Sequence, residues 1–157
     1  TARIVGPEGS RDIPVEEIAT GPGQTSLGRA ELVESVFLPA RGAHAGDAYL
    51  RFIPRTEMDI AVVGAGVSLE IDGGGICTHA RIALGAVGPR VMLVEDAAEA
   101  LIGTSVGEAA LAALAQAASS AATPIDDKRG TVDFRIKVAG VLARRAAIVA
   151  LQRSRVD

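Results

Sequence analysis

Two glycines after a β-branched run are the first residues whose types and spacing suggest chemistry. Residues 60–68 read Ile-Ala-Val-Val-Gly-Ala-Gly-Val-Ser, like the opening of a dinucleotide fingerprint, where glycines let the backbone approach a pyrophosphate at a helix N-terminus. Leu69 stands where the third glycine belongs. Because apolar and polar residues keep alternating through residue 71, a strand is predicted where the fingerprint needs a helix. An independent NAD-binding enzyme built on Gly64 and Gly66 remains an alternative, which a strand over residues 67–71 would exclude.

The other reactive side chains lack partners at a useful spacing. Asp126 and Asp127 are adjacent acids, but general acid or base catalysis needs a partner and a cleft, and carboxylates just before a helix favour its positive end. Cys77 is the single cysteine and forms no internal disulfide, while His44 and His79 have no second ligand at metal spacing. We predict no catalytic residue and no metal site.

Composition excludes two kinds of partner. The net charge is -3 and aromatic residues make up 3% of the 157 residues, so the chain has neither a basic field nor stacking platforms for nucleic acid. No apolar run approaches the roughly 18 residues of a membrane span. The lone cysteine agrees with a reducing compartment, and we expect a cytoplasmic protein. Since the chain opens at Thr1 without an initiator methionine, we also expect a piece of a longer protein.

The elements that position these residues fall into two segments. The first contains strand-like stretches over residues 3–5 and 32–38 and one helical turn over residues 14–18, where proline suits the first helical position. Residues 40–46 are small, contain glycine and lack periodicity, which is typical of a linker. We therefore predict two domains, 1–46 and 47–157.

The second segment reads as strands followed by helices. A strand ending at residue 71, a turn over residues 72–75 and a return strand over residues 81–87 predict an antiparallel pair. Helices are predicted around residues 97–101, over residues 107–122 and from residue 132. On the last helix, the expected apolar stripe is Phe134, Val138, Val141, Leu142 and Val149. The fold class is α+β, a small antiparallel sheet followed by a three-helix layer.

Several stretches taken together resemble the C-terminal domain of the FAD subunits of molybdenum hydroxylases, the family of carbon monoxide dehydrogenase and xanthine dehydrogenase. In the second segment they are AYLRFIPR (48–55), MDIAVV (58–63), ARIALGAV (80–87), PIDD (124–127) and FRIKVAGVLARRA (134–146). The first segment resembles the end of the preceding FAD-binding α+β domain through residues 3–5, 16–25 and 34–39. Order and spacing match the family across nearly the whole second segment, which is more specific than any single stretch, and with the first segment the resemblance covers the whole chain.

The resemblance implies a part of an FAD-binding subunit that relays electrons. A molybdopterin cofactor in a large subunit hydroxylates the substrate, iron-sulfur clusters in a small subunit pass electrons on, and FAD delivers them to an acceptor. Arg51, Asp59 and Ile60 are the contacts carried over to this chain, and Arg51 stands where the family usually has lysine. The glycine-rich loops that hold the FAD pyrophosphate belong to an N-terminal half that this sequence lacks, so we expect the chain alone to hold FAD poorly and to be inactive.

Simpler interpretations of the same residues stay open. Arg51 suits a solvated surface charge, and Asp59 suits a turn residue that binds neighbouring amides. The alternative function is a docking module that contacts other subunits without touching a cofactor. Residues 51–61 are the region that separates the two functions.

Overall fold

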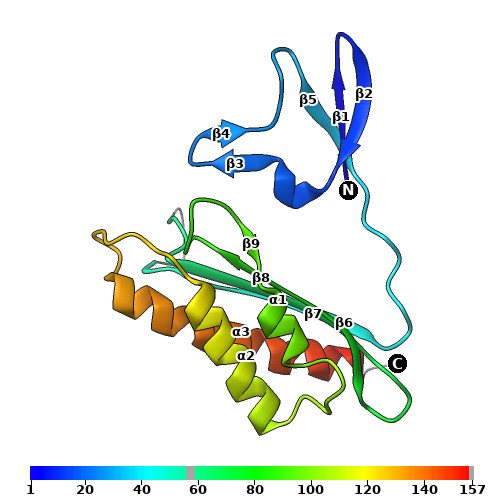
Figure 1. The fold of residues 1–157 in the computed structure, drawn as a ribbon, viewed down its shortest axis with the longest axis vertical. Coiled ribbons are helices and arrows are strands. Elements are labelled where there is room, and N and C mark those ends of the chain that lie inside the picture. The colour runs from blue at the N-terminus through cyan, green and yellow to red at the C-terminus, as the bar shows by residue number, and fades with distance from the viewer. Residues whose placement is uncertain (56–58, 156–157) are drawn as a thin grey trace. The chain divides into compact units, whose positions relative to one another are not determined.

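The computed structural model describes residues 1–55 and 59–155. The chain divides into two compact units, Thr1–Arg41 and Gly42–Asp157, which we call unit 1 and unit 2 (Figure 1). The predicted boundary after residue 46 falls inside β6 (Ala45–Phe52), where Gly46 already pairs with Leu69. Small residues and a glycine here begin a strand instead of continuing a linker.

Unit 1 is built from short antiparallel strands. One sheet has the order β2-β1-β5, and β3 and β4 form a separate hairpin. The elements are β1 Ala2–Gly6, β2 Gly9–Ile13, the 3₁₀ turn η1 Val15–Glu17, β3 Ala19–Gly21, β4 Gln24–Thr25 and β5 Leu32–Val36. The predicted turn after Pro14 and both predicted strands are confirmed, although β5 ends two residues early, at Val36.

Unit 2 is a four-stranded antiparallel sheet with three helices packed against it. The strand order is β6-β7-β8-β9. Besides β6, its elements are β7 Val63–Ile71, β8 Cys77–Gly85, β9 Met92–Leu93, α1 Glu95–Glu99, α2 Glu108–Ala121 and α3 Val132–Ser154. Helix α3 lies against β6 and β7, α2 lies against α3, and α1 lies against β8 and α2 (Figure 1). The predicted α+β class, with an antiparallel sheet followed by three helices, is confirmed.

The β7–β8 hairpin decides between the two interpretations of the glycine motif. Gly64 and Gly66 lie inside β7, which continues as a strand to Ile71. The chain then turns at Asp72, whose Oδ1 accepts hydrogen bonds at 2.9 Å from two amides of the turn, and Gly75 adopts a φ of 79°. No helix follows the glycines, so the dinucleotide fingerprint is excluded.

Helix α3 buries a face of small residues, which matches the stripe expected from the sequence only in part: Leu142 is buried, and Val138 and Val149 pack against the core. Phe134 and Val141 are exposed, whereas the buried positions are mostly alanines. These are Ala139, Ala143, Ala146, Ala147 and Ala150. The reason is a close approach: a β-carbon at Gly46 would lie 2.0 Å from the Ala150 carbonyl oxygen. Large side chains on this face would push helix and sheet apart.

Among the described residues, no helix has both the length and the hydropathy that crossing a membrane requires.

Candidate functional site

Arg51 lies near the end of β6, on the face of the sheet that points away from the helices. We call this the outer face. The alternate residues of β6 point inward, since Gly46 meets Ala150 and the Phe52 ring meets Phe134 of α3. Side chains alternate along a strand, so Arg51 points outward, and its side chain is exposed.

Glycines of β7 flatten the outer face beside Arg51. Tyr49 and Arg51 pair with Gly66 and Gly64, respectively. A β-carbon at Gly64 would lie 2.6 Å from the Tyr49 hydroxyl oxygen, so glycine allows the tyrosine ring to lie across the strand. The outer face thus carries an exposed aromatic ring and an exposed cation side by side on small residues.

Asp59 lies in the connection between β6 and β7, near the start of β7. Its side-chain carboxylate is nearly enclosed, only 6% exposed. Its Oδ2 accepts a hydrogen bond from Arg55 Nε at 3.1 Å, and its Oδ1 accepts one from the Ile60 amide at 2.9 Å. The Arg55 guanidinium is the main reason that the pKa of Asp59 is lowered. Met58, which begins one of the stretches behind the family resemblance, lies outside the described residues.

The β6–β7 connection begins and finishes at the same end of the sheet. The Val62 amide donates to the Phe52 carbonyl oxygen at 2.9 Å. Arg51 precedes Phe52, and Ile60 lies two residues before Val62, so the structure brings these predicted residues to the same end. Ile60 is 66% exposed. Of the three predicted contacts, Arg51 and Ile60 present exposed side chains, and Asp59 holds the backbone between them.

Two arginines behind Asp59 were missed by the sequence analysis. Arg129 Nε lies 3.5 Å from Asp59 Oδ1, and the Arg129 amide donates to Asp127 Oδ1 at 2.8 Å. Arg135, on the first turns of α3 and only 5% exposed, donates through Nη2 to the same Asp127 oxygen. The local sequence gives no signal of such long-range pairs. The one available hint was an arginine on a helix face that otherwise buries alanines.

Asp127 therefore does not act as the sequence analysis expected. It binds two arginines, whereas the start of α3 is capped by Thr131, whose hydroxyl oxygen accepts the Phe134 amide at 3.3 Å. The hydrogen bond from the Arg129 amide is the largest cause of the lowered pKa of Asp127, and the Arg135 guanidinium is the next largest. An ionised carboxylate bound by cations is a poor general acid or base, so the interpretation of residues 126 and 127 as paired catalytic acids has no support.

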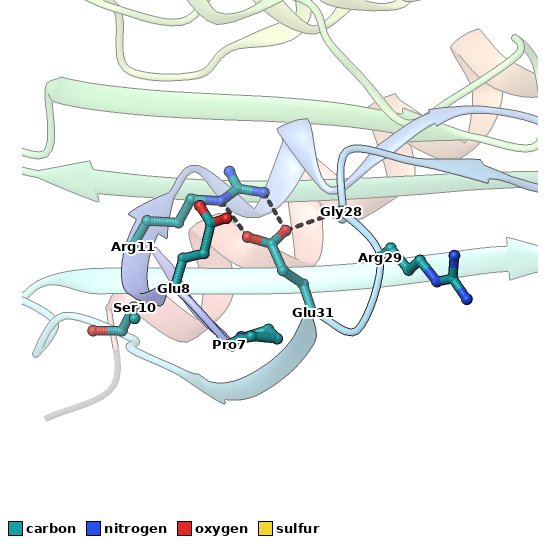
Figure 2. A pocket seen from close by; sticks show the side chains of 9 residues that line it. Pro7, Glu8, Ser10, Arg11, Gly28, Arg29 and Glu31 are labelled. Carbon is teal, nitrogen blue, oxygen red and sulfur yellow. Dashed lines mark hydrogen bonds and ion pairs between the residues drawn. The ribbon is translucent and has the colours of Figure 1, made fainter.

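Unit 1 contains a separate hollow of about 450 Å³ beside the β1–β2 turn (Figure 2). Two of its charged groups pair with each other: Arg11 donates from Nε and Nη2 to the two Glu31 carboxylate oxygens at 3.1 and 2.9 Å, and the Gly28 amide donates to Glu31 at 2.6 Å. These hydrogen bonds lower the pKa of Glu31 to about 2, and the one from Arg11 has the largest effect. The lining also includes the charged side chains of Glu8 and Arg29.

The described residues contain neither a group of side chains suited to bind a metal ion nor a reactive thiol. They contain no group of three or more side chains able to hold a metal ion. Cys77 is buried, burial raises the pKa of its thiol, and Sγ donates to the His79 carbonyl oxygen at 3.3 Å. A thiol of raised pKa is unreactive.

Comparison with known proteins connects this geometry to a family. Residues 48–150 match the family model of the CO dehydrogenase flavoprotein C-terminal domain. The carbon monoxide dehydrogenase medium chain of Afipia carboxidovorans is 32% identical over 97% of this chain and 52% of its own length. The xanthine dehydrogenase FAD-binding subunit of Escherichia coli O157:H7 is 26% identical over 90% of this chain and 49% of its own length.

A solved structure gives the same relationship. The carbon monoxide dehydrogenase of Hydrogenophaga pseudoflava, described as lacking the Mo-pyranopterin moiety of the molybdenum cofactor, superposes with a TM-score of 0.91 at 33% identity. The superposition covers 97% of this chain and 52% of the matched Hydrogenophaga pseudoflava chain. The chain belongs to the CO dehydrogenase flavoprotein C-terminal domain family, and it spans about half the length of the curated relatives it matches. The matched range includes Arg51, Asp59 and Ile60.

Proposed function

We propose that this chain is part of the FAD-binding subunit of a molybdenum-dependent hydroxylase or dehydrogenase and that Arg51, Asp59 and Ile60 form one wall of the flavin site. The family membership and the FAD-binding relatives support the assignment to this class of subunit. The observation that carries the assignment to these residues is the gathering of exposed Arg51 and Ile60 at one sheet end by the bond between Phe52 and Val62.

The residues present fit a flat, partly charged ring system. Gly64 and Gly66 keep the outer face shallow, Ile60 offers an exposed aliphatic side chain, and Arg51 offers hydrogen-bond donors with a fixed charge. FAD, when bound, takes up electrons from iron-sulfur clusters and delivers them to an acceptor. Arg51 would be the residue that stabilises negative charge on a bound flavin, because its guanidinium is a fixed cation.

Asp59 has a different task from Arg51 in this proposal. Its carboxylate already accepts bonds from Arg55, Arg129 and the Ile60 amide. It therefore fixes the backbone at Ile60, while Ile60 supplies the apolar contact. No residue of this chain acts as an acid, a base or a nucleophile.

The partners in this proposal follow from the family. They are a large subunit with molybdopterin, a small subunit with iron-sulfur clusters, and the N-terminal half of the FAD-binding subunit. Two observations support the last of these: the relatives are about twice as long as this chain, and β5 exposes apolar side chains along its length. Without these partners the chain is inactive. The complete complex lies in the cytoplasm, which the lone reduced Cys77 supports.

Replacement of Arg51 in the full-length subunit tests the flavin contact. In Arg51→Ala we expect the FAD dissociation constant to rise roughly tenfold to a hundredfold, since a hydrogen bond to a charged group contributes about 1.5–3 kcal/mol. Arg51→Lys should keep most of the affinity, because the charge remains while the donor geometry changes. The measurement is flavin content and affinity in the purified complex.

Arg145→Ala is the matched control, because Arg145 is an exposed arginine on α3. It should leave flavin binding unchanged. If Arg51→Ala and Asp59→Ala both retained normal flavin content and normal electron transfer, the flavin contact would be wrong and the docking module would be the better interpretation. In that case the exposed Tyr49 and Ile60 would be contacts to another subunit.

A further inference from the structure

The flavin-side residues are tied to a part of the chain that is remote in sequence. Arg129 and Asp59 are 70 positions apart, yet Arg129 Nε approaches Asp59 Oδ1 at 3.5 Å. A second tie joins the same two regions, since the Phe52 and Phe134 rings pack edge to face with centroids 5.7 Å apart. Both ends of the β6–β7 connection are thus held by residues around the start of α3.

Arg129 is itself held in place by Asp127. Asp127 Oδ1 accepts the Arg129 amide at 2.8 Å, and Asp127 Oδ2 lies 3.8 Å from Arg129 Nη1. Asp127 in turn binds the buried guanidinium of Arg135. Arg135 Nη1 also donates to the Ala86 carbonyl oxygen at 3.4 Å, which anchors the chain of charges to the end of β8. The charges alternate in sign from Asp59 to Arg135.

Burial distinguishes this chain of charges from ordinary surface ion pairs. Exposed pairs contribute little because water screens them and their side chains lose freedom. Here the two terminal groups, Asp59 and Arg135, are 6% and 5% exposed. Removing Arg129 takes one cation from the enclosed Asp59 carboxylate and leaves Arg55, whose side chain is 77% exposed, beside it, so the structure around Asp59 must adjust. The Ile60 amide donates to Asp59 Oδ1, the same oxygen that Arg129 approaches, so the Ile60 backbone is directly linked to this ion pair.

We propose that Arg129 is a positioning residue for the flavin wall, and that Arg135 acts through Asp127 to hold Arg129 against Asp59. The proposal rests on the proposed function for its connection to FAD. The positioning of Ile60 itself does not depend on FAD, so the two can be tested separately. Arg129 touches no cofactor in this proposal; it sets where Asp59 and Ile60 lie.

The test is Arg129→Met in the full-length subunit within its complex, because methionine keeps an apolar stem and removes the charge. We expect amide hydrogen exchange at Ile60 and Val62 to become roughly threefold faster or more, since the loss of an ion pair lowers local stability. We also expect weaker retention of FAD. The matched control is Arg144→Met, because Arg144 is 37% exposed against 36% for Arg129 and donates to Glu108 at 2.6 Å.

A double variant shows whether Arg129 acts through Asp59. In an Asp59→Asn background, Arg129→Met should cause little further loss of FAD, since the group that it positions is already gone. A full additional loss would overturn the positioning role. Arg129→Gln serves as a second, milder variant, and the thermal midpoint of unfolding shows whether each variant remains folded.

The outcomes separate this proposal from the proposed function. Unchanged exchange at Ile60 in Arg129→Met, equal to that in Arg144→Met, overturns the positioning role whatever happens to FAD. Faster exchange together with unchanged FAD retention supports the positioning of Ile60 and contradicts the flavin contact. Faster exchange together with weaker FAD retention supports both.

Discussion

At the scale of single residues, arginines keep carboxylates ionised in both units. Arg11 is the main reason that the pKa of Glu31 is lowered, and Arg55 is the main reason at Asp59. Each carboxylate also accepts a backbone amide. Hydrogen bonds to the charged form of a carboxyl group disappear on protonation, so they hold the pKa down and make local structure depend on pH.

Glu31 gives the clearest pH prediction. Its pKa falls from 4.5 in the unfolded chain to about 2 in the fold. Its stabilising effect is therefore complete above pH 4.5 and is lost as the pH falls through about 2. The Gly28 amide donates to Glu31 at 2.6 Å and reports the titration. We expect its proton chemical shift to change with a midpoint near pH 2 in an NMR titration.

Glu31→Gln should abolish this transition at Gly28, because the amide side chain does not titrate. Glu34→Gln, at an exposed glutamate on β5, is the control and should leave the transition in place. A midpoint near the ordinary value of 4.5 would show that Arg11 and Glu31 are not paired in solution.

At the scale of elements, regular patterns were predictable and close approaches were not. The alternation before residue 71 and the turn at Asp72 predicted the β7–β8 hairpin, and alanine-rich periodicity predicted α2. The start of β6 was taken for a linker because Gly46 is small, but small size is what its contact with Ala150 requires. The face of α3 was predicted only in part for the same reason, since hydrophobic periodicity gives more weight to the exposed Phe134 and Val141 than to the buried alanines, although Leu142 was placed correctly.

In the candidate site, too, the residues in local sequence patterns were predictable and those in long-range contacts were not. Arg51, Asp59 and Ile60 were predicted through a family resemblance carried by short stretches of sequence. Arg129 and Arg135 were not found, because their bonds to Asp59 and Asp127 depend on how α3 packs on the sheet. Pairing across 70 positions has no local signature, whereas a turn or a strand does.

The close approach at Gly46 makes a prediction for stability. Gly46→Ala should destabilise unit 2 by about 3 kcal/mol or more, because the new methyl group would lie 2.0 Å from a backbone oxygen and 2.6 Å from the Ser154 amide nitrogen. Backbone atoms cannot move aside as a flexible side chain can. Chemical denaturation of wild type and variant measures the difference.

Gly85→Ala is the matched control in the same sheet. No atom lies within 4 Å of a β-carbon at Gly85. Alanine there should be neutral or should stabilise by up to about 1 kcal/mol, since glycine within a strand costs backbone entropy. Equal effects of the two substitutions would mean that α3 does not approach β6 as closely as described.

At the scale of the whole molecule, the two units differ in how much apolar surface they enclose. The continuous core runs from Ala48 to Ala150 and lies within unit 2. In unit 1 the buried hydrophobic residues, among those described, are Ala2 and Ile4. Burial of apolar area is the main source of stability, so the units should differ greatly in their ability to fold alone.

The separate units test this difference. Gly42–Asp157 expressed alone should unfold cooperatively, because it contains the whole core. Thr1–Arg41 alone should be unfolded, because segments of about 40 residues rarely fold without a disulfide, a metal or a partner, and this one exposes apolar residues such as Leu38. Circular dichroism during heating measures both. A cooperative transition in Thr1–Arg41 would show that its short strands need no covering partner, and it would remove the support that exposed β5 gives to a missing N-terminal half.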